Sequence, residues 1–248
     1  MKTILLILSL CLPLSGFSAG IGFLRPQVRY GLVGHWTLNE GTGTTISDSS
    51  LTNTTGYLTN APTWTTGVVG RALQFDGSTS HASMGDVNSV EGISNLTVAA
   101  WIYPNLTNTR GIIVAKDESG QRSWYLSKSD TSANNTIRFA VGAADAFAYT
   151  TTSVLTGAWT HVAATYSPNE PTNSRILIYI NGVVETPSSY LAPQIIVPAT
   201  TSFLQIGSRQ FTGSRQFFNG RIDDVRIYDR AISADEVKQL YGGGYGSH

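Results

Sequence analysis

Residues 218–237 read FNGRIDDVRIYDRAISADEV and give the clearest indication of architecture in the chain. The first half alternates between polar and apolar residues, which is typical of a β-strand with one buried face. In the second half, Ser233 and Glu236 have the spacing of a capping box, in which each side chain bonds the backbone N–H of the other residue. An apolar stripe follows and is interrupted by the glycines at 242–244. The stretch therefore predicts a strand, a short turn and a helix that ends at those glycines.

Runs of the same alternating type recur upstream, separated by turn signals. The runs at 96–103 and 159–166 carry apolar side chains on both faces, so we predict that each is a central strand of a sheet. An Asp76-Gly77 turn follows the run at 72–75, and residues 80–84 are predicted to return from that turn. Many short strands joined in this way are the signature of a β-sandwich.

Taken in order, these pieces resemble the laminin-G-like (LamG-like jelly-roll) domains of the concanavalin A-like lectin/glucanase superfamily. The matching pieces are GLVGHW at 31–36, EGTG at 40–43, PTW at 62–64, ALQFDG at 72–77, TVAAWI at 97–102, WTHVAATY at 159–166, IYING at 178–182, LQIG at 204–207 and the closing stretch at 218–237. The resemblance implies an all-β fold, a concanavalin A-like jelly-roll sandwich of two antiparallel sheets with one short C-terminal helix. It does not imply an activity, because the superfamily includes sugar binders, adhesion modules and glycosidases.

The composition indicates one neutral, turn-rich domain. The chain has 248 residues, of which 25 are glycine and only 13% are charged. Its 16 basic and 16 acidic residues balance without forming a basic stripe, so nucleic acid and anionic membranes are not expected as partners. We predict one LamG-like domain over residues 31–242, with a lead-in segment at 20–30 and a flexible tail at 243–248.

The first 19 residues have the pattern of a secretory signal peptide. Lys2 precedes an apolar run, and small residues follow it at 18–20. The run is too short to span a bilayer, so we expect cleavage, secretion and no membrane insertion afterwards, with a retained anchor as the alternative. Because Cys11 is the only cysteine and lies inside this segment, the mature chain is predicted to contain no disulfide.

Catalytic patterns are not found in the sequence. A glycoside hydrolase needs two carboxylates on either side of the sugar bond, and the glucanase pattern places them at alternate positions of one strand. None of the glutamates has another carboxylate two residues away along a strand; they are Glu40, Glu91, Glu118, Glu170, Glu185 and Glu236. The sequence also shows no serine elbow, zinc motif or phosphate loop. We therefore predict no enzyme and no catalytic residue, with a hydrolase as the less favoured alternative.

Calcium is the cofactor that the residues suggest, because Ca²⁺ takes about six to eight oxygen ligands that loops of a sandwich can supply. The predicted ligands are Asp76, Asp223 and Asp224, with Asp48 as a further candidate. Simple alternation puts Asp223 on the apolar face of its strand and Asp224 on the face of Arg226, so the two side chains are expected to point apart. Structural roles remain open: Asp76 as a turn residue, and Asp224 as an ion-pair partner.

Carbohydrate binding needs an aromatic ring and hydrogen-bonding side chains on one surface. We predict ligand-binding roles for Trp124, Arg138 and Tyr149, although a tryptophan in a strand is more often a core residue. Alternation places Tyr125 on the face opposite Trp124. Neighbouring strands add two further residues, Asp145 and Phe147, and a second polar patch consists of Arg209, Arg215 and Gln216 near Phe211. The sequence does not rank the two patches.

These observations predict a secreted, non-catalytic, lectin-like module that binds glycan or polysaccharide at the cell surface or in the extracellular matrix. The alternative is a structural or adhesive extracellular protein that binds protein partners or assembles with itself.

Overall fold

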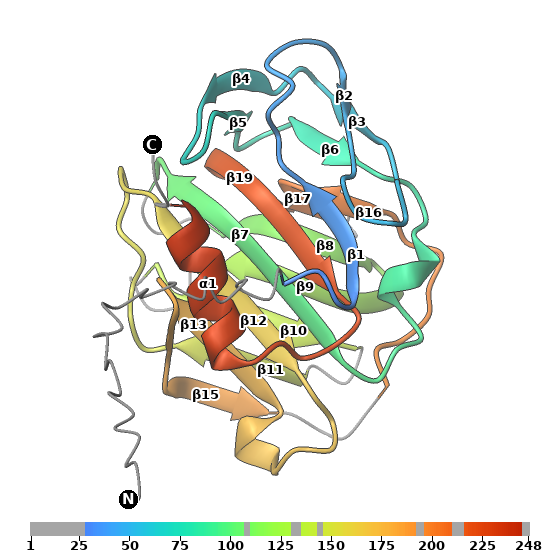
Figure 1. Cartoon of the computed structure of the whole chain (residues 1–248), viewed down its shortest axis with the longest axis vertical. Helices are drawn as coiled ribbons and strands as arrows, with labels where there is room; N and C mark the ends of the chain where they lie inside the picture. Colours follow the sequence, from blue (N-terminus) through green and yellow to red (C-terminus); the bar gives the residue numbers. More distant parts are fainter. Residues whose placement is uncertain are drawn as a thin grey trace, which may run out of the picture.

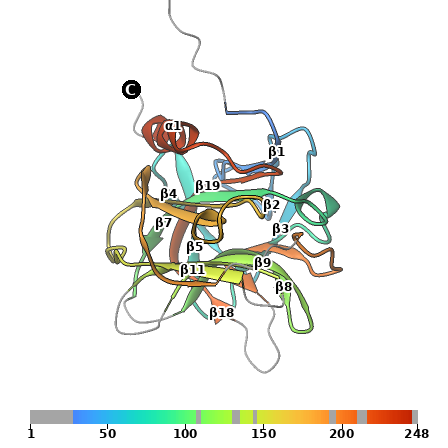
Figure 2. The ribbon, with the colours of Figure 1, turned by 90° about the horizontal axis from the view of Figure 1, so that it is seen from below.

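The computed structural model describes residues 28–106, 110–129, 135–142, 146–191, 196–209 and 216–244. The predicted signal peptide and most of the predicted lead-in segment and tail lie outside these residues. The described chain forms two antiparallel sheets stacked face to face, with one α-helix on the outside (Figure 1). In Figure 2 the helix and the two sheets form successive layers. The predicted all-β sandwich with a C-terminal helix is therefore confirmed.

Sheet A has eight strands. In spatial order they are β14 (Val183–Val184), β13 (Ile176–Ile180), β12 (Thr160–Tyr166), β7 (Leu96–Pro104), β19 (Asn219–Tyr228), β5 (Arg71–Asp76) and β4 (Thr63–Thr66), with β1 (Leu32–Trp36) also paired to β19. Both runs predicted as central strands, β7 and β12, lie inside this sheet and pair with each other. Their position explains why they are apolar on both faces.

Sheet B has nine strands. In spatial order they are β15 (Pro187–Leu191), β11 (Ala146–Thr150), β10 (Ile137–Val141), β9 (Gln121–Lys128), β8 (Gly111–Glu118), β16 (Leu204–Ile206), β6 (His81–Ser83), β3 (Gly56–Thr59) and β2 (Thr45–Ile46). A separate pair, β17 (Ser208–Arg209) and β18 (Gln216–Phe217), packs on β8. Short 3₁₀ turns occur at Asn88–Val90 and Thr172–Ser174.

The prediction that residues 80–84 return beside 72–75 is wrong. Strand β5 pairs with β4 and β19 in sheet A, whereas β6 pairs with β3 and β16 in sheet B. The Asp76-Gly77 turn therefore carries the chain from one sheet to the other. A turn sequence fixes the local backbone direction, but it does not select the strand that accepts the next run.

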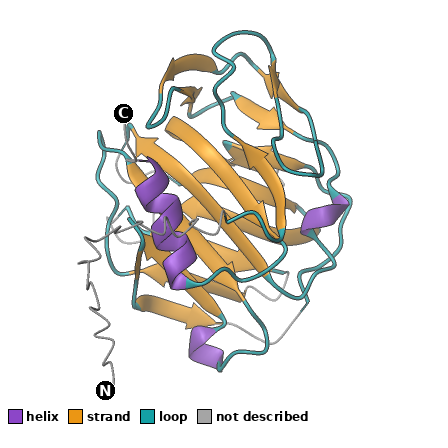
Figure 3. Cartoon of the chain, in the orientation of Figure 1, coloured by secondary structure: helices purple, strands orange, loops and turns teal. Residues whose placement is uncertain are grey.

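The main core lies between the sheets and contains fully buried side chains from both, including Trp36, Phe75, Phe139 and Ile222. Helix α1 (Ala234–Gly244) covers the outer face of sheet A (Figure 3). A second apolar cluster under the helix joins Val237 and Leu240 to strand residues and to Val28. The lead-in segment is thus part of the folded unit from Val28 onwards.

The predicted capping box is confirmed. Ser233 N donates to Glu236 Oε2 at 2.8 Å, and Glu236 N donates to Ser233 Oγ at 3.3 Å. The helix runs through Gly244 and does not stop at Gly242, because a glycine costs about 1 kcal/mol relative to alanine in a helix but does not forbid it. Among the described residues, no helix has the length and apolar character that crossing a membrane requires.

Candidate functional site

The outer face of sheet B carries a row of aromatic and cationic side chains from three neighbouring strands. The strand register places Tyr149 of β11 opposite Arg138 of β10, and Phe147 of β11 opposite Ala140. Ala140 in turn lies opposite Tyr125 of β9, so these side chains share one face. With Arg209 of β17, the residues Tyr125, Arg138, Phe147 and Tyr149 form what we call the arginine–aromatic cluster.

Arg138 lies at the centre of this cluster. Its guanidinium carbon is 5.1 Å from the ring centroids of Phe147 and Tyr149, and 5.2 Å from that of Tyr125. The two β11 rings meet edge to face at 5.5 Å. Such cation–π contacts contribute about 0.5–1 kcal/mol each at exposed sites and fix the orientation of the planar guanidinium. Arg138, Phe147 and Tyr149 are all half-buried, so solvent reaches this part of the cluster.

Arg209 closes the other end of the cluster. Its guanidinium carbon lies 4.2 Å from the Tyr125 ring centroid. It is buried and held by Asp117 Oδ2 at 2.7 Å and by Gln216 Oε1 at 3.0 Å. Tyr125 therefore joins the first predicted patch to Arg209 of the second. Of the other predicted members, Asp145, Phe211 and Arg215 lie outside the described residues.

Two hydroxyl groups on this face are buried without a hydrogen-bond partner among the described residues. They are Tyr125 Oη and Ser127 Oγ, and Ser127 lies opposite Arg138 in the register. Burial raises the pKa of Tyr125, so its phenol stays protonated and is a hydrogen-bond donor. A buried polar group that lacks a partner costs about 1–3 kcal/mol, so a bound hydroxyl or water that satisfies it is favoured.

Trp124 is not an exposed platform. The ring is only 1% exposed and belongs to the core between the sheets. Its Nε1–H donates to the carbonyl oxygen of Val90 at 2.9 Å. Because the neighbouring positions of β9 point to opposite faces, Tyr125 is the aromatic residue that this strand presents to the outside. The prediction of a binding role for Trp124 is corrected, while Arg138 and Tyr149 lie together as predicted.

A family model described as the concanavalin A-like lectin/glucanases superfamily matches residues 76–238 of the chain. The chain belongs to this superfamily. The match includes strands of both sheets and the first five residues of the helix, and it contains every residue of the arginine–aromatic cluster. The resemblance inferred from the sequence is thereby confirmed.

Three solved structures show how the superfamily fold is shared. Domain 4 of AbnA, an extracellular arabinanase from Geobacillus stearothermophilus in complex with arabinotriose, has a TM-score of 0.66 and 20% identity, covering 86% of this chain and 99% of that chain. The binding domain of botulinum neurotoxin DC, in complex with rat synaptotagmin II, has a TM-score of 0.64 and 13% identity over 86% of this chain and 52% of that one. Botulinum neurotoxin type C, whose cell entry depends upon interaction with two ganglioside molecules, has a TM-score of 0.64 and 12% identity. The similarity covers 86% of this chain and 51% of that chain.

The chain thus spans nearly all of the arabinanase domain but about half of each toxin chain. At these identities the similarity shows the fold. The ligands of those proteins are properties of those proteins, and the site of this superfamily member has to be argued from its own side chains.

The predicted calcium ligands have other partners in the structure. Asp76 Oδ1 accepts from the backbone N–H groups of Ser78, Thr79 and Ser80 at 2.9–3.0 Å, and Oδ2 accepts from Thr79 Oγ1 at 2.8 Å. Burial alone would raise the pKa of Asp76, but these hydrogen bonds outweigh it and hold the pKa well below its usual range. Asp76 is therefore the turn residue that connects the two sheets.

Asp223 and Asp224 lie at a β-bulge, so simple alternation fails there. Asp224 has a φ of 46°, and the register shifts between Asp223 and Arg226. Asp223 lies opposite Trp101, whose ring faces the helix, so Asp223 is not on the apolar face that alternation predicts. Asp224 Oδ1 is 2.7 Å from His35 Nε2, while Asp223 Oδ2 accepts from Val68 N at 2.8 Å.

Their different surroundings shift the pKa values of the two carboxyl groups in opposite directions. Burial raises the pKa of Asp223 to about 7. The N–H groups of Val68 and Val69 act in the opposite direction, but their effect is smaller. For Asp224 the His35 hydrogen bond and the charge of Arg226 outweigh burial and lower the pKa to about 2. In the described part of the chain, no group of three or more His, Cys, Asp or Glu side chains is placed to hold a metal ion. Asp76, Asp223 and Asp224 therefore do not form one shared calcium site.

Proposed function

We propose that this chain is a secreted, non-catalytic carbohydrate-binding module whose binding surface is the arginine–aromatic cluster. The observation that carries the proposal is the arrangement of Arg138 among three rings, beside two buried hydroxyls that lack partners. Support comes from the superfamily and from similar structures that bind arabinotriose and gangliosides. Secretion rests on the pattern of residues 1–19.

The chemistry of the cluster suits a sugar ring. The half-exposed faces of Phe147 and Tyr149 offer apolar surface to the C–H side of a pyranose or furanose. The half-buried Arg138 offers donors to its hydroxyl groups, while the hydroxyls of Tyr125 and Ser127 are buried on the same face of the sheet. The stacked contacts hold the rings before ligand arrives, which lowers the entropy lost on binding. Because the exposed part of the cluster consists of the three half-buried side chains of Arg138, Phe147 and Tyr149, we expect Kd values between about 1 mM and 1 μM.

Binding without hydrolysis is favoured by the pairing of Asp117, the carboxylate that holds Arg209 in the cluster. Asp117 is 1% exposed at its side chain, and it is paired with Arg209 at 2.7 Å and with Arg122 at 3.7 Å. A glycosidase acid or base needs a carboxyl group that reaches the glycosidic oxygen or a water and exchanges its proton. Because Asp117 is buried and held by two guanidinium groups, it positions Arg209 and is not exposed to a sugar bound on the cluster.

The second candidate function is recognition of a protein partner, which the similar toxin domain in complex with synaptotagmin II favours. Exposed hydrophobic side chains such as Leu155, Ile196 and Phe203 are available for such a contact. Concentration-dependent association measured by light scattering tests self-assembly, the form of this function that needs no further partner.

A glycan and polysaccharide array tests the main proposal. The chain without the predicted signal residues is applied with calcium and again with EDTA, next to the variants Tyr149→Ala and Tyr57→Ala. Tyr57 is the matched control, because it is 62% exposed on the same sheet but far from the cluster in the strand order. We expect the glycan affinity of Tyr149→Ala to be about tenfold or more lower than that of the wild type, because one aromatic contact with the sugar is lost. The affinity of Tyr57→Ala should be unchanged.

Three results would each change the proposal. Equal loss in both variants would remove the cluster as the binding surface. Loss of binding in EDTA would support the predicted calcium and direct mutagenesis to Asp76, Asp223 and Asp224 one at a time. Absence of binding to every glycan on the array would favour the protein-binding function.

A further inference from the structure

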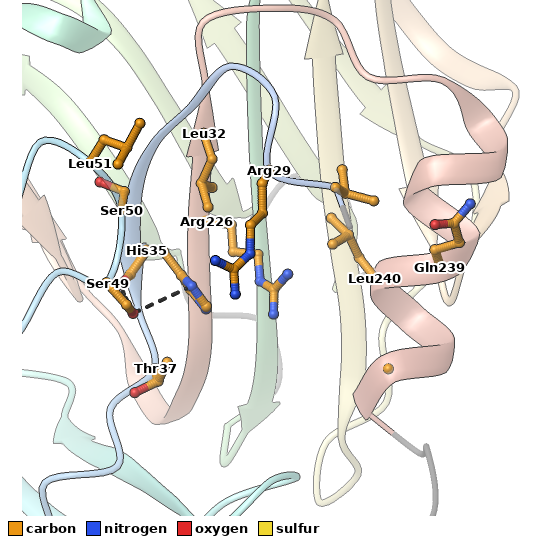
Figure 4. A pocket seen from close by; sticks show the side chains of 12 residues that line it. Arg29, Leu32, His35, Thr37, Ser49, Ser50, Leu51, Arg226, Gln239 and Leu240 are labelled. Carbon is orange, nitrogen blue, oxygen red and sulfur yellow. Dashed lines mark hydrogen bonds between the residues drawn. The ribbon is translucent and has the colours of Figure 1, made fainter. Parts of the chain in front are cut away.

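A cavity of about 630 Å³ lies between helix α1, strand β1 and residues 49–51 (Figure 4). This volume is within the range of about 300–1,000 Å³ that is usual for small-molecule sites. The cavity is on the outer side of sheet A, whereas the arginine–aromatic cluster is on the outer side of sheet B. It is therefore a second potential site, separated from the first by the whole core.

The lining of the cavity combines apolar walls with a few polar groups. Leu32 and Leu240 form walls on the strand and on the helix, while Thr37 and Gln239 contribute a hydroxyl and an amide. Neither Thr37 nor Gln239 makes a side-chain hydrogen bond to another described residue. Their donors and acceptors are available to a ligand that carries hydroxyl groups.

The cavity has an excess of positive charge. Arg29 and Arg226 line it, and among the described lining residues none is acidic. Asp224 lies behind them and accepts from His35 Nε2 at 2.7 Å and from Arg226 Nη2 at 3.1 Å. Arg29 makes no ion pair or hydrogen bond to another described side chain, so its charge is not compensated.

The two guanidinium groups converge. Figure 4 shows the side chains of Arg29 and Arg226 pointing into the same space between His35 and helix α1. The charge of Arg226 is paired with Asp224 whereas that of Arg29 is not, so the space between the two guanidinium groups has a net positive charge that attracts an anion. Arginine pairs are well suited to a planar carboxylate, which each guanidinium can bind through two parallel N–H···O bonds.

The walls are fixed before a ligand enters. Asp48 accepts from the backbone N–H groups of His35 at 2.9 Å and of Ser50 at 2.8 Å, which ties residues 49–51 to strand β1. Burial alone would raise the pKa of Asp48, but these and further hydrogen bonds lower it, so the tie is present at neutral pH. A site that needs little ordering loses less entropy on binding.

From these features we propose that the cavity binds a sugar acid. Its carboxylate lies between Arg29 and Arg226, its ring packs between Leu32 and Leu240, and its hydroxyl groups bond Thr37 or Gln239. The charge excess selects the acid over a neutral sugar, and the apolar walls and free hydroxyl-binding groups select a sugar acid over a small carboxylate such as acetate.

Ser49 and His35 of the cavity wall form a hydrogen-bond sequence with Asp224 behind them, an order that nucleophilic catalysis also uses. The Ser49 hydroxyl lies 3.4 Å from His35 Nδ1 but donates to the His35 carbonyl oxygen at 3.0 Å. A nucleophile must pass its proton to the imidazole, and here the closer acceptor is a backbone oxygen. The arrangement orients His35 for binding and does not activate Ser49.

The test uses the whole chain and three probes: D-glucuronate, D-glucose as the same ring without the carboxylate, and acetate as the carboxylate without the ring. Titration is followed by amide chemical-shift changes. We expect shifts at residues of β1, 49–51 and α1 with D-glucuronate at concentrations up to about 10 mM, a range that covers weak sugar contacts. Glucose and acetate are expected to bind at least about tenfold more weakly at these residues.

Two variants complete the test. Arg29→Gln removes the uncompensated charge at an exposed position, and Arg71→Gln is the matched control, because Arg71 is an exposed arginine of sheet A outside the cavity. D-glucuronate binding should weaken about tenfold or more in Arg29→Gln, as for one charge-assisted contact, and stay unchanged in Arg71→Gln. It should also persist in Tyr149→Ala, which separates this site from the proposed glycan surface. Equal binding of glucose and glucuronate, or full binding by Arg29→Gln, would overturn the proposal.

Discussion

Replacement of Trp124 distinguishes a core residue from a binding residue, because the structure buries this ring and leaves Tyr149 half exposed. Trp124→Ala removes a fully packed ring and should destabilise the protein by about 3–5 kcal/mol. Trp124→Phe keeps most of the ring but leaves the Val90 carbonyl without the Nε1–H donor that now lies at 2.9 Å. We expect that variant to lose about 1–3 kcal/mol, the cost of an unsatisfied buried acceptor.

Urea and thermal unfolding followed by circular dichroism measure both losses. In a domain of this size each kcal/mol lowers Tm by roughly 2–4 °C, so Trp124→Ala should unfold roughly 6–20 °C below the wild type. Tyr149→Ala is the control; it loses an exposed stacking contact and should cost about 1 kcal/mol or less. Wild-type stability of Trp124→Ala combined with lost glycan binding would refute the assignment of this ring to the core.

Two further predictions concern buried charges. The pKa of Asp223 is raised to about 7 from an ordinary value of 3.8, so its contribution to stability is complete below about pH 4 and is lost as the pH rises through about 7. The difference in unfolding free energy between wild type and Asp223→Asn, measured in urea at pH 5 and pH 8, should therefore shift in favour of the variant at pH 8; an equal difference at both values would contradict the pKa assignment. Lys116 is fully buried between Asp86 at 2.5 Å and Glu91 at 3.2 Å, so Lys116→Met should cost about 3–5 kcal/mol in the same assay. Adding Glu91→Gln should recover part of that loss, and a further loss in the double variant would show that the two carboxylates do not depend on this lysine.

Features that depend on a few neighbouring residues were predictable from the sequence. The capping box of Ser233 and Glu236 forms within four residues, and its two hydrogen bonds are present as predicted. The central strands β7 and β12 were marked by apolar side chains on both faces, since each has a layer on either side. In both cases the information lies inside the element itself.

Features that depend on distant partners were not predictable in this way. Whether residues 80–84 join sheet A or sheet B depends on β3 and β16, which are far away in sequence. The bulge at Asp224 reverses the direction of Asp223, and a single extra residue in a strand leaves no period that alternation can detect. The bulge, rather than the expected alternation, therefore determines the surroundings of Asp223 and Asp224, and calcium binding by either residue stays a prediction.

The candidate site was predictable in part: the sequence showed which side chains share a face of β9, but not which face is buried. Alternation correctly placed Trp124 and Tyr125 on opposite faces, but it does not say which face is inside. The composition of β9 contains the missing signal, because Trp124 alternates with Leu126 whereas Tyr125 alternates with two serines. The more apolar set is the buried one. The contact between Arg209 and Tyr125 had no such signal, since it joins segments more than 80 residues apart.

Helix α1 determines which surfaces remain for ligands. It packs Val237 and Leu240 on the outer face of sheet A and stacks Tyr241 on Trp101 at 5.6 Å, so a flat ligand has no access to that face. What remains there is the cavity at the edge of the helix, which is small and positively charged and therefore suits a single acidic sugar. On the described outer face of sheet B no helix intervenes, and Arg138, Phe147 and Tyr149 of the cluster remain half-buried. Because the core separates the two proposed sites, we expect a ligand at one site to leave the other accessible.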